Sequence, residues 1–71
     1  MNEIDAMNLV RGKLKGYRVK RVEETPEVYL FMCEYPDPDY VPSKIAVAVN
    51  KKSSKIGSSL YSYDEAIRFA K

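Results

Sequence analysis

The last third of the chain constrains the fold most, because a strand pattern there gives way to a helix pattern. Residues 45–50 read Ile-Ala-Val-Ala-Val-Asn and predict a strand with one large apolar face and one small apolar face. Residues 50–54 are polar and predict a turn, and residues 55–61 predict a second, short strand. Ser62 and Glu65 stand at the spacing of a capping box, so we expect a short final helix.

The beginning of the chain predicts an amphipathic helix over residues 3–15. Asn2 is a suitable N-cap, and Gly16 stands where a left-handed residue ends many helices. Gly12 lies inside the pattern and costs about 1 kcal/mol relative to alanine, which indicates either fraying or close packing nearby. The apolar stripe expected to face the core consists of Ile4, Met7, Val10 and Leu14.

Two further strands are predicted between these regions. Residues 17–24 alternate at first and then lose parity at Val22, which indicates a bulge near Lys20–Arg21 or a turn of the strand. Residues 28–35 are apolar on both faces, as expected of an interior strand or of a strand whose second face meets a partner. Three prolines within residues 36–42 predict a stiff loop.

The chain is therefore expected to form one α+β domain over residues 1–71. The element order is helix, three or four antiparallel strands, and helix. Hairpin-length links favour antiparallel neighbours, and the simplest arrangement is a two-layer fold with both helices on one sheet face. An open sheet keeps at least one unpaired edge, which permits a homodimer through that edge.

Catalytic and metal-binding chemistry has few residues to draw on. The chain has no histidine and one cysteine, which excludes an internal disulfide and a zinc cage and removes the most common general base. Cys33 lies in the middle of a predicted strand, and we interpret it as a buried structural thiol and not as a nucleophile. Asp37 and Asp39 lack the remaining ligands of a calcium loop. We expect no enzymatic activity, no cofactor and no metal site.

The sequence also bears on location. No apolar run approaches the roughly 20 residues of a membrane span, and Glu3 and Asp5 stand where a secretory signal peptide would carry bases. Together with the free thiol, these features predict a cytoplasmic protein without membrane contact.

Charge is unevenly distributed along the chain, although the net charge is only +2. Residues 11–21 hold six bases and no acid, and residues 23–39 hold six acids and no base. The two blocks either pair across a hairpin or form separate surfaces that meet a ligand. We favour cross-strand pairing, since an isoelectric point near 8.7 is low for a nucleic-acid-binding protein. The alternative is a nucleic-acid surface on segment 11–21, with Arg18, Lys20 and Arg21 as the contacting residues.

Six tyrosines in 71 residues form the most suggestive functional feature. Several of them flank predicted loops, and tyrosine is enriched in protein interfaces because it offers a large, rigid ring with a polar tip. They could equally be amphipathic rim residues of a domain too small to bury them. The candidate partner-binding residues are Tyr35, Asp37, Asp39, Tyr40, Tyr61 and Tyr63.

Part of the chain resembles known small domains. Val49-Asn50-Lys51-Lys52, Lys55-Ile56-Gly57 and Tyr63-Asp64-Glu65 resemble the strand–turn–strand unit and helix start of PepSY-like domains and of small bacterial toxin-immunity proteins. The leading helix and Gly16-Tyr17-Arg18-Val19 fit the same order. Those families usually carry glycine in the turn where this chain has Ser53-Ser54. The resemblance implies a binding or inhibitory module without catalytic residues.

The leading hypothesis is a non-enzymatic protein–protein interaction module of bacterial or phage type, with an inhibitory or immunity-like role. Its basis is the lack of catalytic residue types, the segregated charge and the tyrosines near loops. One alternative is a nucleic-acid-binding accessory protein. Another alternative is a structural homodimer.

Overall fold

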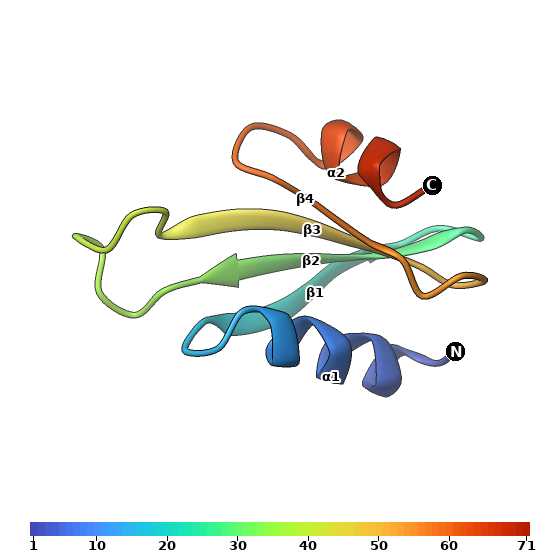
Figure 1. Cartoon of the computed structure of the whole chain (residues 1–71), viewed down its shortest axis with the longest axis horizontal. Helices are drawn as coiled ribbons and strands as arrows, with labels where there is room; N and C mark the ends of the chain where they lie inside the picture. The colour runs from blue at the N-terminus through green and yellow to red at the C-terminus, as the bar shows by residue number, and fades with distance from the viewer.

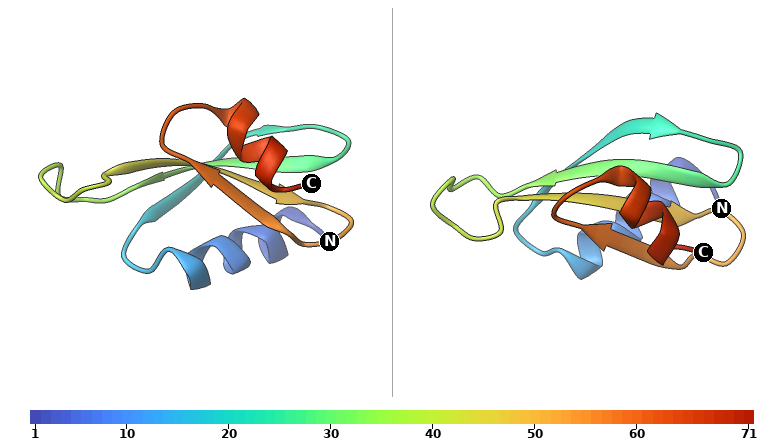
Figure 2. Two further views of the ribbon diagram at one scale, coloured as in Figure 1. Left: turned by 45° about the horizontal axis from the view of Figure 1, so that its top comes forward. Right: turned by 90° about the horizontal axis from the view of Figure 1, so that it is seen from above.

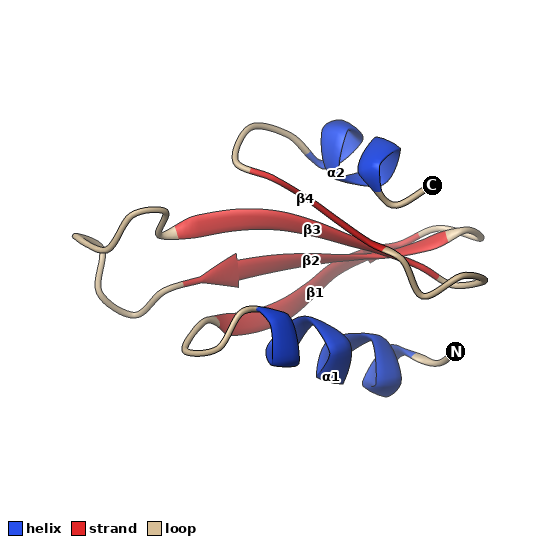
Figure 3. Ribbon diagram, viewed as in Figure 1, coloured by secondary structure: helices blue, strands red, loops and turns tan.

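Four antiparallel strands, adjacent in chain order, form the centre of the computed structural model, which describes residues 1–71 (Figures 1 and 3). One helix precedes the sheet and one follows it, so the predicted α+β fold with an antiparallel sheet is confirmed. Neither helix is long and apolar enough to cross a lipid bilayer. The elements are α1 (Glu3–Lys13), β1 (Arg18–Glu24), β2 (Val28–Glu34), β3 (Lys44–Asn50), β4 (Ile56–Ser59) and α2 (Tyr63–Phe69).

The two helices cover opposite faces of the sheet, so the prediction that both lie on one face in two layers is wrong (Figures 1 and 2). The reason lies in β2, which is apolar on both sides. Tyr29 and Phe31 point into a core with α1, whereas Val28 and Leu30 point into a core with α2. A single covering layer would leave one of these apolar faces in water, and a third layer removes that cost.

The core under α1 is the larger of the two. From the helix, Ala6 and Val10 are fully buried against the sheet, while Ile4 is 70% exposed. The predicted stripe is therefore wrong at Ile4, because residues two apart on a helix point about 200° apart and the sheet selects the side of Ala6. The buried members of this core are Ala6, Val10, Tyr29, Phe31, Cys33, Ile45, Val47 and Val49.

The core under α2 depends on small residues. A β-carbon added to Gly57 of β4 would lie 2.1 Å from the carbonyl oxygen of Ala66, so the α2 backbone rests directly on this strand. Ala48 of β3 is paired with Gly57 and is fully buried beside them. Asn50 fixes the far end of the helix, because its side-chain amide donates to the carbonyl of Ala70 at 3.0 Å. The small face of β3 is thus the seat of a closely packed helix.

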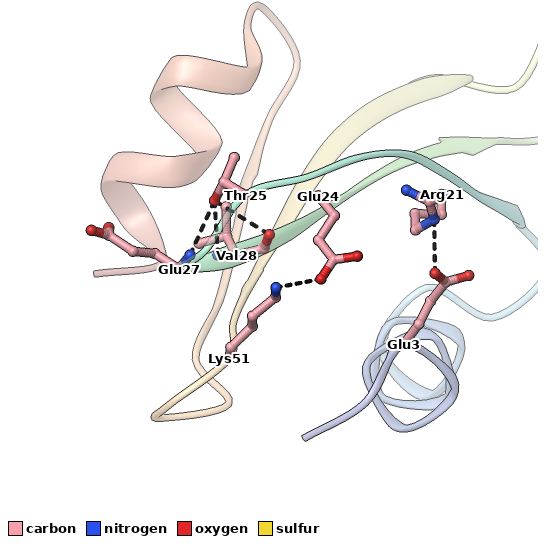
Figure 4. Close-up of polar contacts among 7 residues, drawn as sticks. All are labelled: Glu3, Arg21, Glu24, Thr25, Glu27, Val28 and Lys51. Atoms are coloured by element: carbon pink, nitrogen blue, oxygen red, sulfur yellow. Dashed lines mark hydrogen bonds and ion pairs between the residues drawn. The ribbon is translucent and has the colours of Figure 1, made fainter.

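Two hairpin turns lie at the same end of the sheet, and each is stabilised by hydrogen bonds to a side chain within it. The Oγ1 atom of Thr25 accepts hydrogen bonds from the amides of Glu27 and Val28 at 3.2 and 3.0 Å (Figure 4). In the other turn, Asn50 accepts from two backbone amides through Oδ1, and Ser54 takes a positive φ of 66°. This left-handed residue stands at the place where the resembling families carry glycine.

Both helices start at the predicted N-caps. Asn2 accepts from the amide of Asp5 at 2.9 Å, and Ser62 accepts from the amide of Glu65 at 3.1 Å. The reciprocal half of the capping box is not formed at α2, because the Glu65 carboxylate accepts from the hydroxyl of Ser59 at 3.0 Å. That hydroxyl also receives the two amides before the helix, so the whole β4–α2 connection is tied to Ser59.

Candidate interaction surface

Helix α2 covers only part of its sheet face, and the uncovered part forms a groove. The helix packs on β3, on β4 and on the end of β2 nearest the Thr25 turn. The other end of β2 and the adjoining part of β1 remain open beside the first turn of α2 (Figure 2). The groove has a volume of about 430 Å³, and its lining residues are Arg18, Lys20, Val22, Met32, Glu34 and Tyr63.

Strand register explains why these residues share one face. Residues directly opposite each other in antiparallel strands point to the same side of the sheet, and the register places Lys20 opposite Met32. The pairing of β1 with β2 shifts between Arg21 and Glu23, so the strand has a bulge, and the bulge lies at Val22, next to the predicted place at Lys20–Arg21. Val22 is 44% exposed at the groove margin, although sequence reasoning attached no function to it. Its broken parity was the only signal.

The walls of the groove differ in chemistry. On the α2 side, Tyr63 is half-buried, and burial raises the pKa of its hydroxyl, which therefore stays protonated at neutral pH. On the β1 side stand two exposed bases, Arg18 and Lys20. Met32, partly buried, lies between them. The groove thus combines an apolar centre with a cationic margin and a hydroxyl, which suits recognition of a ligand that is partly apolar and partly anionic.

The two charge blocks do not pair with each other, so the favoured cross-strand pairing is wrong. The three ion pairs join Glu3 to Arg21, Glu34 to Lys44 and Glu24 to Lys51, and none of them links residues 11–21 to residues 23–39. The antiparallel register sets the basic strand against residues 31–34, where Glu34 is the only acid. Most acids of the second block instead lie at the Thr25 turn or in the β2–β3 loop.

The three residues suggested for nucleic-acid contact are divided between the two faces. Arg18 and Lys20 line the groove, whereas Arg21 lies opposite Phe31 on the α1 side, with its Nε atom 2.7 Å from a carboxylate oxygen of Glu3 (Figure 4). Alternation along β1 causes this division. Only the first two are available to one ligand.

Tyr35 and Tyr40 contact each other and Tyr17. Their rings stack with centroids 3.9 Å apart, and Tyr17 meets them edge-on at 5.1 and 6.2 Å. The Tyr17 hydroxyl donates to the carbonyl of Pro42, and burial raises the pKa of Tyr17. These tyrosines hold the β2–β3 loop against the start of β1. The sequence did not predict that Tyr17 contacts the β2–β3 loop, because no local pattern indicates a contact between residues 25 positions apart.

The remaining candidates occupy two loops. Asp37 and Asp39 are exposed at the tip of the β2–β3 loop, where Asp37 accepts from the amide of Asp39 at 3.0 Å. No group of three or more histidine, cysteine or acidic side chains comes together that could hold a metal ion. Tyr61 is 87% exposed in the β4–α2 loop, so of the six partner-binding candidates only Tyr63 lines the groove.

Cys33 belongs to the core under α1. It is fully buried, and burial raises the pKa of its thiol to about 11. At neutral pH the side chain is therefore a neutral thiol without access to solvent.

A second hollow of about 310 Å³ lies on the other face of the sheet, between α1 and β4. Two of its lining residues, Val10 and Val47, are fully buried members of the core. We assign this hollow to the incomplete cover of β4 by α1, and we place the candidate surface at the groove beside α2.

Comparisons with models of protein families, with curated proteins and with solved structures give no match. The functional argument therefore depends on the groove and on the chemistry of its residues. The resemblance of residues 45–71 to PepSY-like domains and toxin-immunity proteins stays a prediction.

Proposed function

We propose that the chain is a non-enzymatic protein–protein interaction module of bacterial or phage type, which acts in the cytoplasm and binds its partner in the groove beside α2. One observation carries this proposal: α2 covers only part of its sheet face and leaves an accessible apolar strip with a basic margin. Methionine, tyrosine and arginine are enriched in protein interfaces, and Met32, Tyr63 and Arg18 stand together in this groove.

An inhibitory or immunity-like role fits the same arrangement. Such a protein acts by occupying a surface of its partner, and this requires a rigid face with no catalytic group on it. Asn50 of β3 and Ser59 of β4 tie α2, which forms one wall of the groove, to the sheet, so this wall is preorganised. The resemblance of residues 45–71 to toxin-immunity proteins supports the same class.

Site-specific photo-crosslinking in the native host tests the proposal. A photoreactive residue at Val22, on the groove, is compared with one at Ile4, which is more exposed than Val22 and lies on the outer side of α1. We expect crosslinking at Val22, but not at Ile4, to capture one protein. That protein should bind the purified Val22→Glu variant more weakly than the unchanged chain, and it should bind the Ile4→Glu variant with unchanged affinity. Equal capture at both positions, or equal affinity for both variants, would contradict the proposal.

A nucleic-acid-binding accessory protein is the second candidate. It is favoured by Arg18 and Lys20, which stand in the groove outside every ion pair, with the ring of Tyr63 in the same groove. Glu34 in the groove and the low net charge argue against a phosphate-tracking surface. Titration of labelled single-stranded DNA and RNA at low and high salt tests this candidate function. Binding through phosphate contacts would weaken steeply as the salt concentration rises.

A further inference from the structure

Within the proposed function, we infer that the groove takes an extended acidic segment of the partner protein, with carboxylates two residues apart and one large apolar side chain beside them. The inference rests on the spacing and charge of the lining residues. It names the partner's chemistry, which the proposed function leaves open.

The spacing comes from β1. Arg18 and Lys20 are two residues apart on a strand and point to the same face, so their α-carbons are about 6.6 Å apart. Acidic residues at alternate positions of an extended chain have the same repeat. A partner segment that runs along β1 in an extended conformation therefore presents one carboxylate to each base.

The charge of the groove favours an anionic ligand. Glu34 is the only acid among the lining residues, and its carboxylate lies 3.8 Å from the ammonium of Lys44. Arg18 stands directly opposite Glu34 in the strand register, but neither Arg18 nor Lys20 forms an ion pair. The groove thus holds two bases against one acid, and this net positive charge steers an acidic segment toward it and orients it.

The apolar part of the groove supplies the anchor site. Val22 and Met32 give it aliphatic surface and Tyr63 gives it a ring, within a volume in the range of about 300–1,000 Å³ typical of ligand pockets. A leucine or phenylalanine side chain that enters here excludes water from these three residues. Charge alone would not fix the position of the partner segment along the groove. The apolar side chain fixes it, because it fits at one place only.

Asp37 and Asp39 of the chain itself are two residues apart, as the inferred ligand requires, but they do not lie in the extended conformation that it requires. Asp37 accepts from the amide of Asp39 through its side chain and from the amide of Tyr40 through its carbonyl, at 3.0 and 3.1 Å. This segment is a turn closed by the stacked tyrosines and is not extended. We therefore assign the groove to a different protein and not to a second copy.

Fluorescence anisotropy with labelled peptides tests the inference on the full chain. The probe is an eight-residue peptide with two glutamates at alternate positions followed by leucine. The matched peptides carry lysine for both glutamates, or serine for the leucine, and a ten-residue oligothymidylate serves as the nucleic-acid probe. We expect binding of the first peptide only, and about a tenfold loss of affinity with Arg18→Glu plus Lys20→Glu, since two exposed ion pairs become repulsive.

The control variant carries Arg11→Glu plus Lys15→Glu, which changes the net charge equally at exposed positions outside the groove. We expect its affinity for the peptide to stay within about twofold of the unchanged chain, because neither residue lines the groove and salt weakens interactions between exposed charges that are not in contact. Arg18→Gln plus Lys20→Gln repeats the groove test without new acids if the reversed pair impairs folding.

Several results would overturn the inference. These are equal loss of affinity in the groove variant and the control, equal binding of the serine peptide, or tighter binding of the oligothymidylate through the groove. If no acidic peptide binds while Val22 still captures a protein that Ile4 does not, the partner chemistry is wrong and the proposed function stands. If Val22 captures nothing, the proposed function fails as well.

Discussion

At the scale of single residues, Ser54 has a backbone conformation that is unfavourable for a residue with a β-carbon. Its φ of 66° lies in the left-handed region, where a β-carbon crowds the following carbonyl oxygen. The turn needs this conformation, because the amide of Ser54 donates to the carbonyl of Asn50 at 2.9 Å. Glycine adopts the same backbone without the penalty.

Ser54→Gly is therefore expected to stabilise the protein by about 0.5–1 kcal/mol, the left-handed penalty less the greater chain entropy of glycine. Urea unfolding followed by circular dichroism measures the change. Ser53→Gly is the matched control, since Ser53 has no positive φ and accepts from the amide of Lys55 at 3.2 Å. The control should lower the stability, and a gain in both variants would contradict the assignment.

Cys33 shows the effect of burial on an ionisable group. Its pKa is raised from 9.0 to about 11, so the folded state holds the proton more tightly than the unfolded chain does. The stability linked to this group is complete below pH 9 and is lost as the pH rises from about 9 to about 11.

Two measurements check the prediction for Cys33. Native protein at pH 8 should react with a thiol reagent only at the rate of global unfolding, because the thiolate fraction is on the order of 0.001 and the sulfur is buried. The urea midpoint should also fall more steeply between pH 9 and pH 11 than that of Cys33→Ala. Fast labelling of the native chain, or parallel slopes, would contradict the burial of this thiol.

At the scale of the elements, Gly12 and Gly57 show that the two helices meet their surroundings differently. A β-carbon at Gly12 of α1 would find nothing within 4 Å, so the close packing considered for it is absent. A β-carbon at Gly57 of β4 would lie 2.1 Å from the carbonyl oxygen of Ala66 in α2 and 2.5 Å from the amide nitrogen of Ala70, the C-cap of this helix. A helix of seven residues does not persist without docking, so its contact with Gly57 decides whether α2 forms.

Opposite results are expected for alanine at these two positions. Gly12→Ala should stabilise the chain by about 1 kcal/mol through helix propensity. Gly57→Ala should destabilise it by about 3 kcal/mol or more, because the backbone of α2 must move away. Urea unfolding measures both, and amide hydrogen exchange in residues 63–70 reports the release of α2. Unchanged exchange there in Gly57→Ala would show that the close approach is wrong.

The elements could be predicted from local patterns, but their faces could not. Both N-caps and the bulge have a signal within a few residues: the caps stand at the predicted residues, and the bulge lies next to the predicted place at Lys20–Arg21. The side of α1 that faces the sheet is the side of Ala6. Alanine contributes less than isoleucine to a hydrophobic pattern, so the pattern favoured the side of Ile4. The groove combines residues from β1, β2 and α2, and its position depends on how far α2 reaches across the sheet.

At the scale of the whole molecule, the sheet edges decide how copies of the chain meet. β1 is one edge and β4 is the other. β1 carries a bulge at Val22 and is otherwise rich in charge, and β4 has only four residues with α2 packed against it. Bulges, charges and short length are the devices by which edge strands avoid pairing with another chain. These features oppose a structural homodimer through a sheet edge.

The protein is accordingly expected to sediment as a monomer of 8.2 kDa at tens of micromolar. Deletion of Val22 removes the bulge and gives β1 a regular, longer edge, so this variant should associate more strongly than the unchanged chain. Val22→Ala is the control, because it keeps the bulge and removes only the exposed side chain. Sedimentation equilibrium over a tenfold range of concentration measures all three proteins. A stable dimer of the unchanged chain would contradict this prediction.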